Sequence, residues 1–201
     1  MLIKSKKIFL RATKYCNFAS TQQKSNMTDE QIVKGCIEKN AIAQKNLYEK
    51  FARKMMGVCL RYCDSTEEAE DVVQNGFISV FENIGSFKGT GSLEGWVRKI
   101  MVNTALTNIR KNKKLKQNIE LDSVEFMLPS NTYINDNFAA KDLLKIIQTL
   151  PLGFKTVFNL YAIEGYSHKE IGEMLNISEG TSKSQYSRAK AYLQKIIPID
   201  R

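Results

Sequence analysis

Apolar residues recur every three or four positions along most of the chain, and this periodicity constrains the fold more than any other feature. The longest stripe follows a glycine-rich loop and consists of Leu93, Trp96, Val97, Ile100, Met101, Ala105 and Ile109. Residues spaced in this way share one face of an α-helix, whereas a half-buried strand alternates every second residue. No stretch of the sequence shows that alternation. We therefore expect an all-α protein.

A polar stretch over residues 115–138 interrupts the helical pattern and divides the chain. It is rich in Asn, Asp and Ser and contains a proline, a composition typical of a flexible linker between compact units. We expect one small helical domain over residues 27–114 and a second over 139–201. Residues 1–26 are expected to be an N-terminal tail, with Met27 as a candidate translation start. The short apolar run in this tail lacks the length and the cleavage site of a secretory signal.

The charge balance points to a polyanionic partner. The chain of 201 residues has a formal net charge of +9 and a pI near 9.3, which favours nucleic acid ahead of an anionic membrane. Basic residues follow one another from Gly95 to Asn118 without an acidic one. A solvated helix end would also carry cations, but this run exceeds what a helix end needs and favours phosphate contacts. The candidates are Lys88, Arg98, Lys99, Asn103, Arg110, Lys111, Lys113 and Lys114.

Catalytic and metal-binding residues are not evident. The four cysteines, Cys16, Cys36, Cys59 and Cys63, form no disulfide framework, and His168 is the only histidine. These residues give no zinc-ligand pattern, so we expect reduced, buried thiols in a cytoplasmic protein. No nucleophile with a base and no pair of carboxylates suggests a reaction. We expect no cofactor, no metal and no enzymatic activity.

The glycine-rich loop in "SFKGTGSLEGWVRKI", residues 86–100, has the composition of a phosphate-binding loop. A Walker A loop requires its lysine directly after the last glycine, whereas Lys88 precedes Gly89, and Gly91 is followed by Ser92. An amphipathic helix is expected before the loop, where nucleotide-binding motifs place a strand. A nucleotide-binding enzyme therefore stays a minor alternative. Phe87, in the same loop, is a candidate for stacking on an unpaired base.

The second domain contains the pattern of a helix-turn-helix. Ser167 and Glu170 form a capping box before a short helix from His168 to Leu175, and Ser178 begins a longer helix from about Glu179 to Ile196. The small Gly172 would allow the two helices to cross closely. Polar side chains near the start of the second helix are predicted to face outward, toward a DNA major groove. They are Ser178, Glu179, Thr181, Ser182, Lys183, Gln185, Ser187 and Arg188.

Three separate segments, taken together, resemble the extracytoplasmic-function (ECF) sigma factors of bacterial RNA polymerase. "EEAEDVVQNGFISVFENIGSF" and "GSLEGWVRKIMVNTALTNIRKNKK" are similar to region two of that family, and "LPLGFKTVFNLYAIEGYSHKEIGEMLNISEGTSKSQYSRAKAYL" is similar to region four. The chain departs from the family pattern at Thr107, Asn108, Ser182 and Gln185, where many members carry an acidic residue, an aromatic residue, a hydrophobic residue and an arginine.

The resemblance implies a promoter-specificity factor for transcription initiation. Core polymerase would bind at Asp71, Val72, Gln74 and Asn75. The glycine-rich loop and the helix behind it would open and hold the minus-ten element, and the helix-turn-helix would recognise the minus-thirty-five element. An anti-sigma factor is the further partner that the resemblance implies. A stand-alone helix-turn-helix transcriptional regulator shares the C-terminal pattern and is the main alternative.

Overall fold

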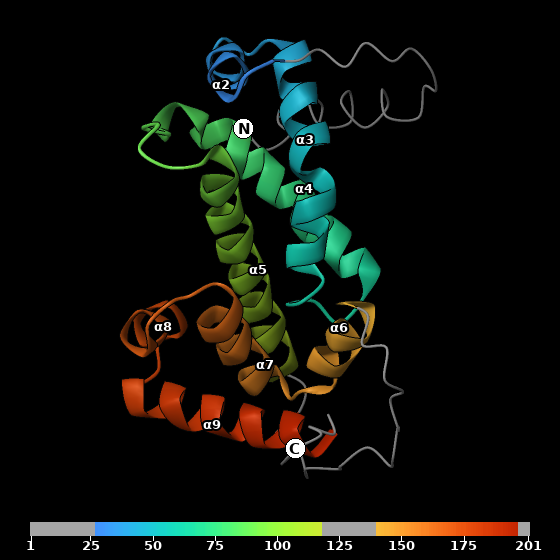
Figure 1. Cartoon of the computed structure of the whole chain (residues 1–201), viewed down its shortest axis with the longest axis vertical. Helices are drawn as coiled ribbons and strands as arrows, with labels where there is room; N and C mark the ends of the chain where they lie inside the picture. Colours follow the sequence, from blue (N-terminus) through green and yellow to red (C-terminus); the bar gives the residue numbers. More distant parts are fainter. Residues whose placement is uncertain (1–26, 118–139, 197–201) are drawn as a thin grey trace. The chain divides into compact units, whose positions relative to one another are not determined.

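The computed structural model describes residues 27–117 and 140–196, and each element in these ranges is a helix or helical turn (Figure 1). The elements are α2 (Asp29–Ile37), α3 (Ala41–Cys59), α4 (Thr66–Asn83), the 3₁₀ turn η1 (Ile84–Ser86), α5 (Leu93–Gln117), α6 (Ala140–Thr149), α7 (Leu152–Phe158), the π-helical turn η2 (Asn159–Ile163), α8 (His168–Leu175) and α9 (Glu179–Ile196). The all-α prediction is confirmed. None of the described helices is long and apolar enough to cross a membrane.

The chain divides into two compact units, Met1–Asn108 and Ile109–Arg201. The division falls within α5, a few residues before the boundary predicted at 114. The predicted tail, residues 1–26, lies outside the described residues. So does the predicted linker over 115–138, apart from its first residues, which end α5.

In the first unit, capping side chains determine where the helices begin. Thr28 and Gln31 form the predicted capping box at α2, since each side chain accepts a hydrogen bond from the other residue's backbone N–H. Asn40 caps α3, and Ser65 caps α4 by accepting from the backbone N–H of Glu68. These caps satisfy N–H groups that a helix cannot pair internally.

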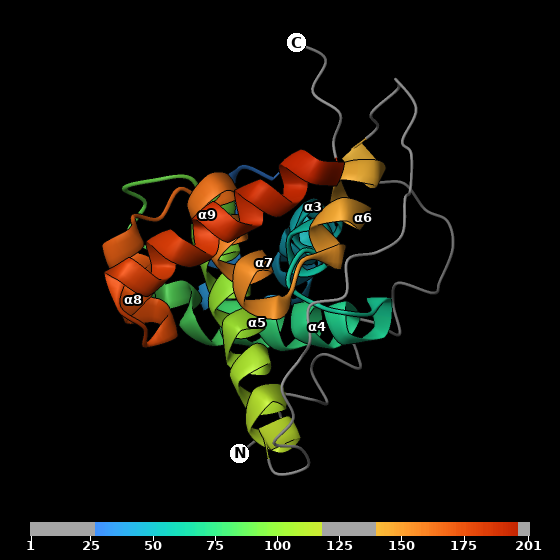
Figure 2. The same cartoon turned by 90° about the horizontal axis from the view of Figure 1, so that it is seen from below.

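Helices α3, α4 and α5 bury their apolar faces against one another. Phe51 of α3 and Phe77 of α4 are almost fully buried, and α3 and α4 pack against each other at an inclined crossing (Figures 1 and 2). The buried positions of α5 are Leu93, Val97, Met101, Val102, Ala105 and Leu106. The predicted stripe on α5 is thus confirmed at its centre, while Trp96, Ile100 and Ile109 are half-buried.

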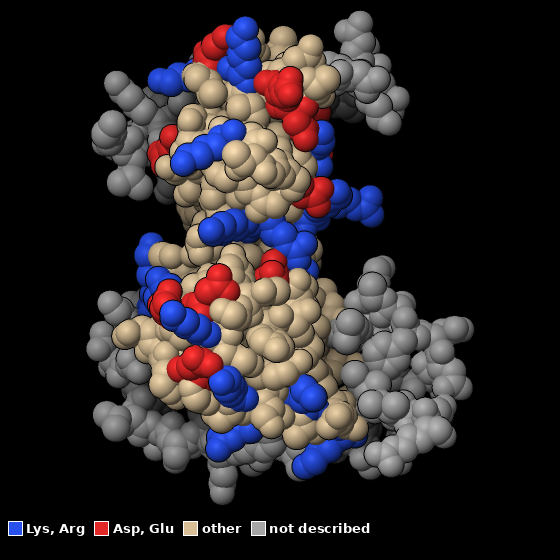
Figure 3. Space-filling view, turned by 60° about the vertical axis from the view of Figure 1, so that its left-hand side comes forward, with Lys and Arg blue, Asp and Glu red and all other residues tan. Residues whose placement is uncertain are grey.

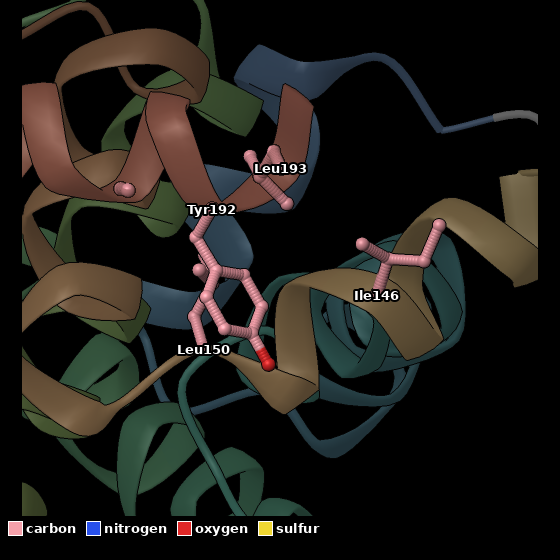
Figure 4. Close-up of a cluster of buried hydrophobic side chains, with 5 residues drawn as sticks. Ile146, Leu150, Tyr192 and Leu193 are labelled. Carbon is pink, nitrogen blue, oxygen red and sulfur yellow. The ribbon is translucent and has the colours of Figure 1, made fainter. Parts of the chain in front are cut away.

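In the second unit, α9 packs along α7 and α6, with α8 beside the beginning of α9 (Figures 1 and 2). Its core contains Ile146 of α6 and Leu150, which directly follows α6, against Ala189, Tyr192 and Leu193 of α9 (Figure 4). Burial of these apolar side chains provides the main driving force for association of the helices.

The helix-turn-helix has the predicted boundaries. Ser167 and Glu170 form the capping box of α8, and Ser178 accepts a hydrogen bond from the Thr181 backbone N–H. Asn176 adopts the left-handed conformation that ends α8 (φ 54°). A Cβ atom added at Gly172 would lie 2.8 Å from the Ile177 carbonyl oxygen. The close approach predicted for Gly172 is therefore confirmed.

Candidate nucleic-acid interface

Three of the four polymerase-docking candidates lie on the exposed surface of α4. Asp71, Gln74 and Asn75 are exposed, and their spacing of three and four places them on one side of the helix. Val72 is only 1% exposed and belongs to the core between the helices. Its side chain cannot contact a partner, so the prediction for Val72 is corrected to a packing role.

A groove of about 400 Å³ between α3 and α4 adjoins these exposed residues. Gln74 lies along the α4 side and Arg53 along the α3 side, with the partly buried Tyr48 between apolar neighbours. A polar rim over an apolar floor is suited to binding a protein helix. Sequence analysis missed this groove because its residues come from two helices.

The glycine-rich loop lies between η1 and α5. Gly89 has a φ of +71°, which glycine adopts without the strain of a side chain, and Lys88 beside it is exposed. Phe87 is half-buried, and its ring lies 5.7 Å from that of Trp96 with an interplanar angle of 59°. The loop therefore carries an aromatic pair at its base and an exposed cation at its tip.

The polar face of α5 forms a surface that we call the α5 stripe: Lys99, Asn103, Thr107, Arg110 and Lys111, all exposed. Their spacing of mostly three and four keeps them on one side of the helix, opposite the buried residues. Arg98 is half-buried at the edge of this stripe. Lys113 and Lys114 lie in α5, but their side chains are outside the described residues. The stripe combines cations with hydrogen-bonding groups, as a nucleic-acid backbone requires.

Of the predicted contact residues in α9, Glu179, Lys183, Ser187 and Arg188 are exposed. Glu179 and Lys183 form an ion pair of 2.6 Å between Oε1 and Nζ. The hydrogen bond and the charge of Lys183 lower the pKa of the Glu179 carboxyl. Ser178 is exposed, but its hydroxyl caps α9. On the face shown in Figure 3, lysine and arginine side chains are mixed with acidic ones within each unit, so the cationic surfaces are local to particular helices.

Ser182 and Gln185 do not face outward as predicted. Ser182 is fully buried, and its Oγ lies 3.0 Å from His168 Nδ1 of α8. Gln185 is half-buried and its amide lies against α7, since a Cβ added at Gly153 would be 3.3 Å from Gln185 Oε1. Thr181 is also half-buried. Polarity alone misled the prediction, because a buried polar group is stable where it finds a hydrogen-bond partner.

The cysteines of the described residues are structural. Cys36, Cys59 and Cys63 are buried and form no disulfide. Burial raises the pKa of the Cys36 thiol to about 11 and that of the Cys59 thiol to about 12. No cluster of His, Cys, Asp or Glu that could hold a metal ion occurs among the described residues. Cys16 lies outside them.

Two family models match the two units in chain order. The family described as sigma-70 region 2 matches residues 47–115, and the family described as sigma-70 region 4 matches residues 140–193. The first match contains the α4 docking candidates, the loop and the α5 stripe. The second contains the helix-turn-helix.

Curated relatives match over most of their length. The RNA polymerase sigma-H factor of Pseudomonas aeruginosa is 25% identical over 84% of this chain and 93% of its own length. The ECF RNA polymerase sigma factor SigW of Bacillus subtilis is 29% identical over 83% and 92%. Among solved structures, the sigma factor RpoE of Bartonella quintana, crystallised with the anti-sigma factor NepR, has a similar fold. It shows a TM-score of 0.50 and 21% identity, covering 78% of this chain and 99% of its own.

Proposed function

The chain belongs to the sigma-70 family, in its extracytoplasmic-function group, and we infer that it binds core RNA polymerase, directs it to promoters and helps to open DNA. The observation that carries this function is the order of the two modules, region 2 followed by region 4 with a helix-turn-helix. A stand-alone helix-turn-helix regulator would account for the second module but not for the first.

We assign core polymerase to the exposed face of α4. Asp71, Gln74 and Asn75 offer one carboxylate and two amides on a single side of the helix, beside the groove that contains Arg53. Such a surface suits a charged helical partner, because amides and charged groups determine the register while the apolar floor excludes water. In the family, that partner is the coiled coil of the largest polymerase subunit.

We assign the minus-ten element to the loop and the α5 stripe. Lys88 at the loop tip and Lys99, Arg110 and Lys111 along α5 supply positive charge for a phosphate backbone. Phe87, half-buried against Trp96, supplies an aromatic surface for an unstacked base. Asn103 is placed to donate to a base edge or to a phosphate. Arg98, Lys113 and Lys114 complete the predicted set of contacts with the strand.

We assign the minus-thirty-five element to α9. Lys183 and Arg188 are exposed on this helix and would contact phosphates or base edges. Further polar contacts would come from the cap and first turns of α9, namely from Ser178, Glu179, Thr181 and Gln185. Ser182 is buried and would contribute only through its hydrogen bond to His168.

We further propose that the chain performs no chemistry of its own and needs no cofactor, because the polymerase makes the RNA. Its site of action is then the cytoplasm, where polymerase works. An anti-sigma factor is the proposed regulatory partner, by analogy with the complex known for the Bartonella quintana sigma factor.

Co-purification with core polymerase tests the docking surface. Asp71→Lys reverses the charge of an exposed α4 residue and should reduce the affinity for core at least tenfold, as loss of an interface hot spot does. Glu30→Lys is the matched control, since Glu30 is an exposed acidic residue on α2 and does not line the groove. Equal retention of core by both variants would remove α4 from the interface. Failure of the unaltered chain to retain core would contradict the proposed function itself.

A further inference from the structure

The only histidine of the chain joins the two helices of the helix-turn-helix. His168 is the first residue of α8, and its Nδ1 shares a hydrogen bond of 3.0 Å with the Oγ of Ser182 on α9. The Ser182 side chain is fully buried, with 0% of its surface exposed. Such a hydroxyl is costly to leave without a partner, so the hydrogen bond favours the helix arrangement in which it forms.

Aromatic rings hold the imidazole of His168 in place. The ring stacks on Tyr161, with centroids 4.2 Å apart and an interplanar angle of 8°. Tyr186 of α9 lies 4.6 Å from Tyr161 and 5.8 Å from His168. Tyr161 belongs to η2, the π-helical turn. Three consecutive elements of the second unit therefore meet at one polar and aromatic cluster, which we call the His168 latch: His168, Ser182, Tyr161 and Tyr186.

The latch lies directly beneath the part of α9 that carries its outward side chains. Ser182 is next to Lys183, and Tyr186 is two residues before Arg188. A hydrogen bond depends on direction as well as distance, whereas an apolar contact at the same position would tolerate rotation of α9 about its axis. Ser182 is also a position at which the sequence departs from the hydrophobic residue of the family pattern.

We propose that the His168 latch is a positioning device: it sets the rotation of α9 on α8, and thereby determines which upstream promoter sequences the holoenzyme accepts. The proposal rests on the proposed sigma function and concerns how region 4 of this chain selects its element. His168 and Ser182 are positioning residues, since they act through Lys183 and Arg188.

The test uses variants that separate the hydrogen bond from the ring stack. His168→Phe retains a ring on Tyr161 but removes Nδ1, and His168→Asn retains a polar atom near that position but removes the ring. Ser182→Ala removes the hydroxyl. Ser184→Ala is the matched control, because its hydroxyl donates to the Thr181 carbonyl within α9 and does not reach α8.

Each variant is reconstituted with core polymerase and transcribes a promoter library in which the upstream element is randomised and the minus-ten region is fixed. The preference among upstream sequences is a ratio within one reaction, so a loss of folded protein leaves it unchanged. His168→Phe and Ser182→Ala should each reduce the preference for the favoured element by roughly three- to tenfold, the factor expected from one hydrogen bond. The double variant should be no worse than either single one, since both remove the same interaction. His168→Asn should stay within about twofold of the unaltered chain.

Unchanged preferences in His168→Phe and Ser182→Ala would overturn the proposal, as would additive losses in the double variant. A loss in His168→Asn equal to that in His168→Phe would also overturn it, because the ring stack would then be the cause. If the unaltered holoenzyme transcribes no template, the sigma function fails and the latch proposal falls with it. If it transcribes with a clear preference that the variants keep, only the latch proposal fails.

Discussion

Glu179 and Lys183 form an ion pair on the exposed surface of α9, one helical turn apart. Their side chains are 49% and 60% exposed, so the pair adds little to stability. We expect its effect to be electrostatic, because an anion at the start of the proposed recognition helix opposes the approach of DNA phosphates. The lowered pKa of Glu179 keeps its carboxylate ionised at more acid pH than an ordinary glutamate.

Neutralising Glu179 should therefore strengthen nonspecific DNA binding. In Glu179→Gln the charge of Lys183 is no longer compensated, and the slope of log affinity against log salt should steepen by about one. In the unaltered chain, Glu179 becomes protonated only as the pH falls through its lowered pKa. The salt slope of the unaltered chain should therefore steepen in the same way only in acid. Fluorescence anisotropy with a duplex over a salt series measures the slope. Adding Lys183→Gln to this variant should return the salt slope to that of the unaltered chain. An unchanged slope in Glu179→Gln would show that the ion pair does not face the DNA.

The buried cysteines should be unreactive in the native protein. Burial raises the pKa of Cys36 to about 11 and of Cys59 to about 12, so at pH 8 their thiolate fractions lie roughly a hundredfold or more below that of free cysteine. In a Cys16→Ser background, Ellman's reagent should titrate the thiols rapidly only after addition of denaturant. The native rate should rise with pH toward those raised pKa values. A rapid native reaction of a full thiol equivalent would contradict their burial.

Among the elements, the crossing of α8 and α9 depends on a glycine. Gly172→Val places a branched side chain where a Cβ alone would lie 2.8 Å from the Ile177 carbonyl oxygen. It should lower the free energy of unfolding of the second unit by about 1–3 kcal/mol. Gly180→Ala is the control, because a Cβ there meets only the Ser178 hydroxyl at 3.7 Å and alanine favours the helix by up to about 1 kcal/mol. Urea denaturation compares them, and equal stability of the two variants would contradict the close crossing.

Element boundaries were predictable where local chemistry fixes them. The capping boxes at Thr28 and Ser167 depend on residues three apart, so the sequence contains the whole interaction. Ser182 and Val72 were misplaced because their burial depends on partners far along the chain or on neighbouring helices. The π-helical turn that contains Tyr161 was also missed, and the contacts of its ring with His168 of α8 and Tyr186 of α9 are not visible in the local sequence.

In the whole molecule, two sigma-70 family modules follow each other on one chain, and we propose that each recognises one part of the promoter. The first unit combines the α4 surface with the loop and the beginning of α5, and the second presents α9. The family could be inferred from the sequence because its motifs are local and occur in a fixed order. The exposure of the proposed contact residues could be inferred only in part, since it depends on how the helices pack.

Transcription in vitro with core polymerase, the full chain and a promoter library tests the central claim most directly. The account predicts transcripts that start downstream of a two-part sequence motif and that depend on this chain. It also predicts that Lys99→Ala with Arg110→Ala, on the α5 stripe, weakens transcription and makes it less sensitive to salt, because fewer phosphate contacts remain for salt to screen. Absence of any transcript above the level of core polymerase alone, with the chain bound to core, would contradict the account.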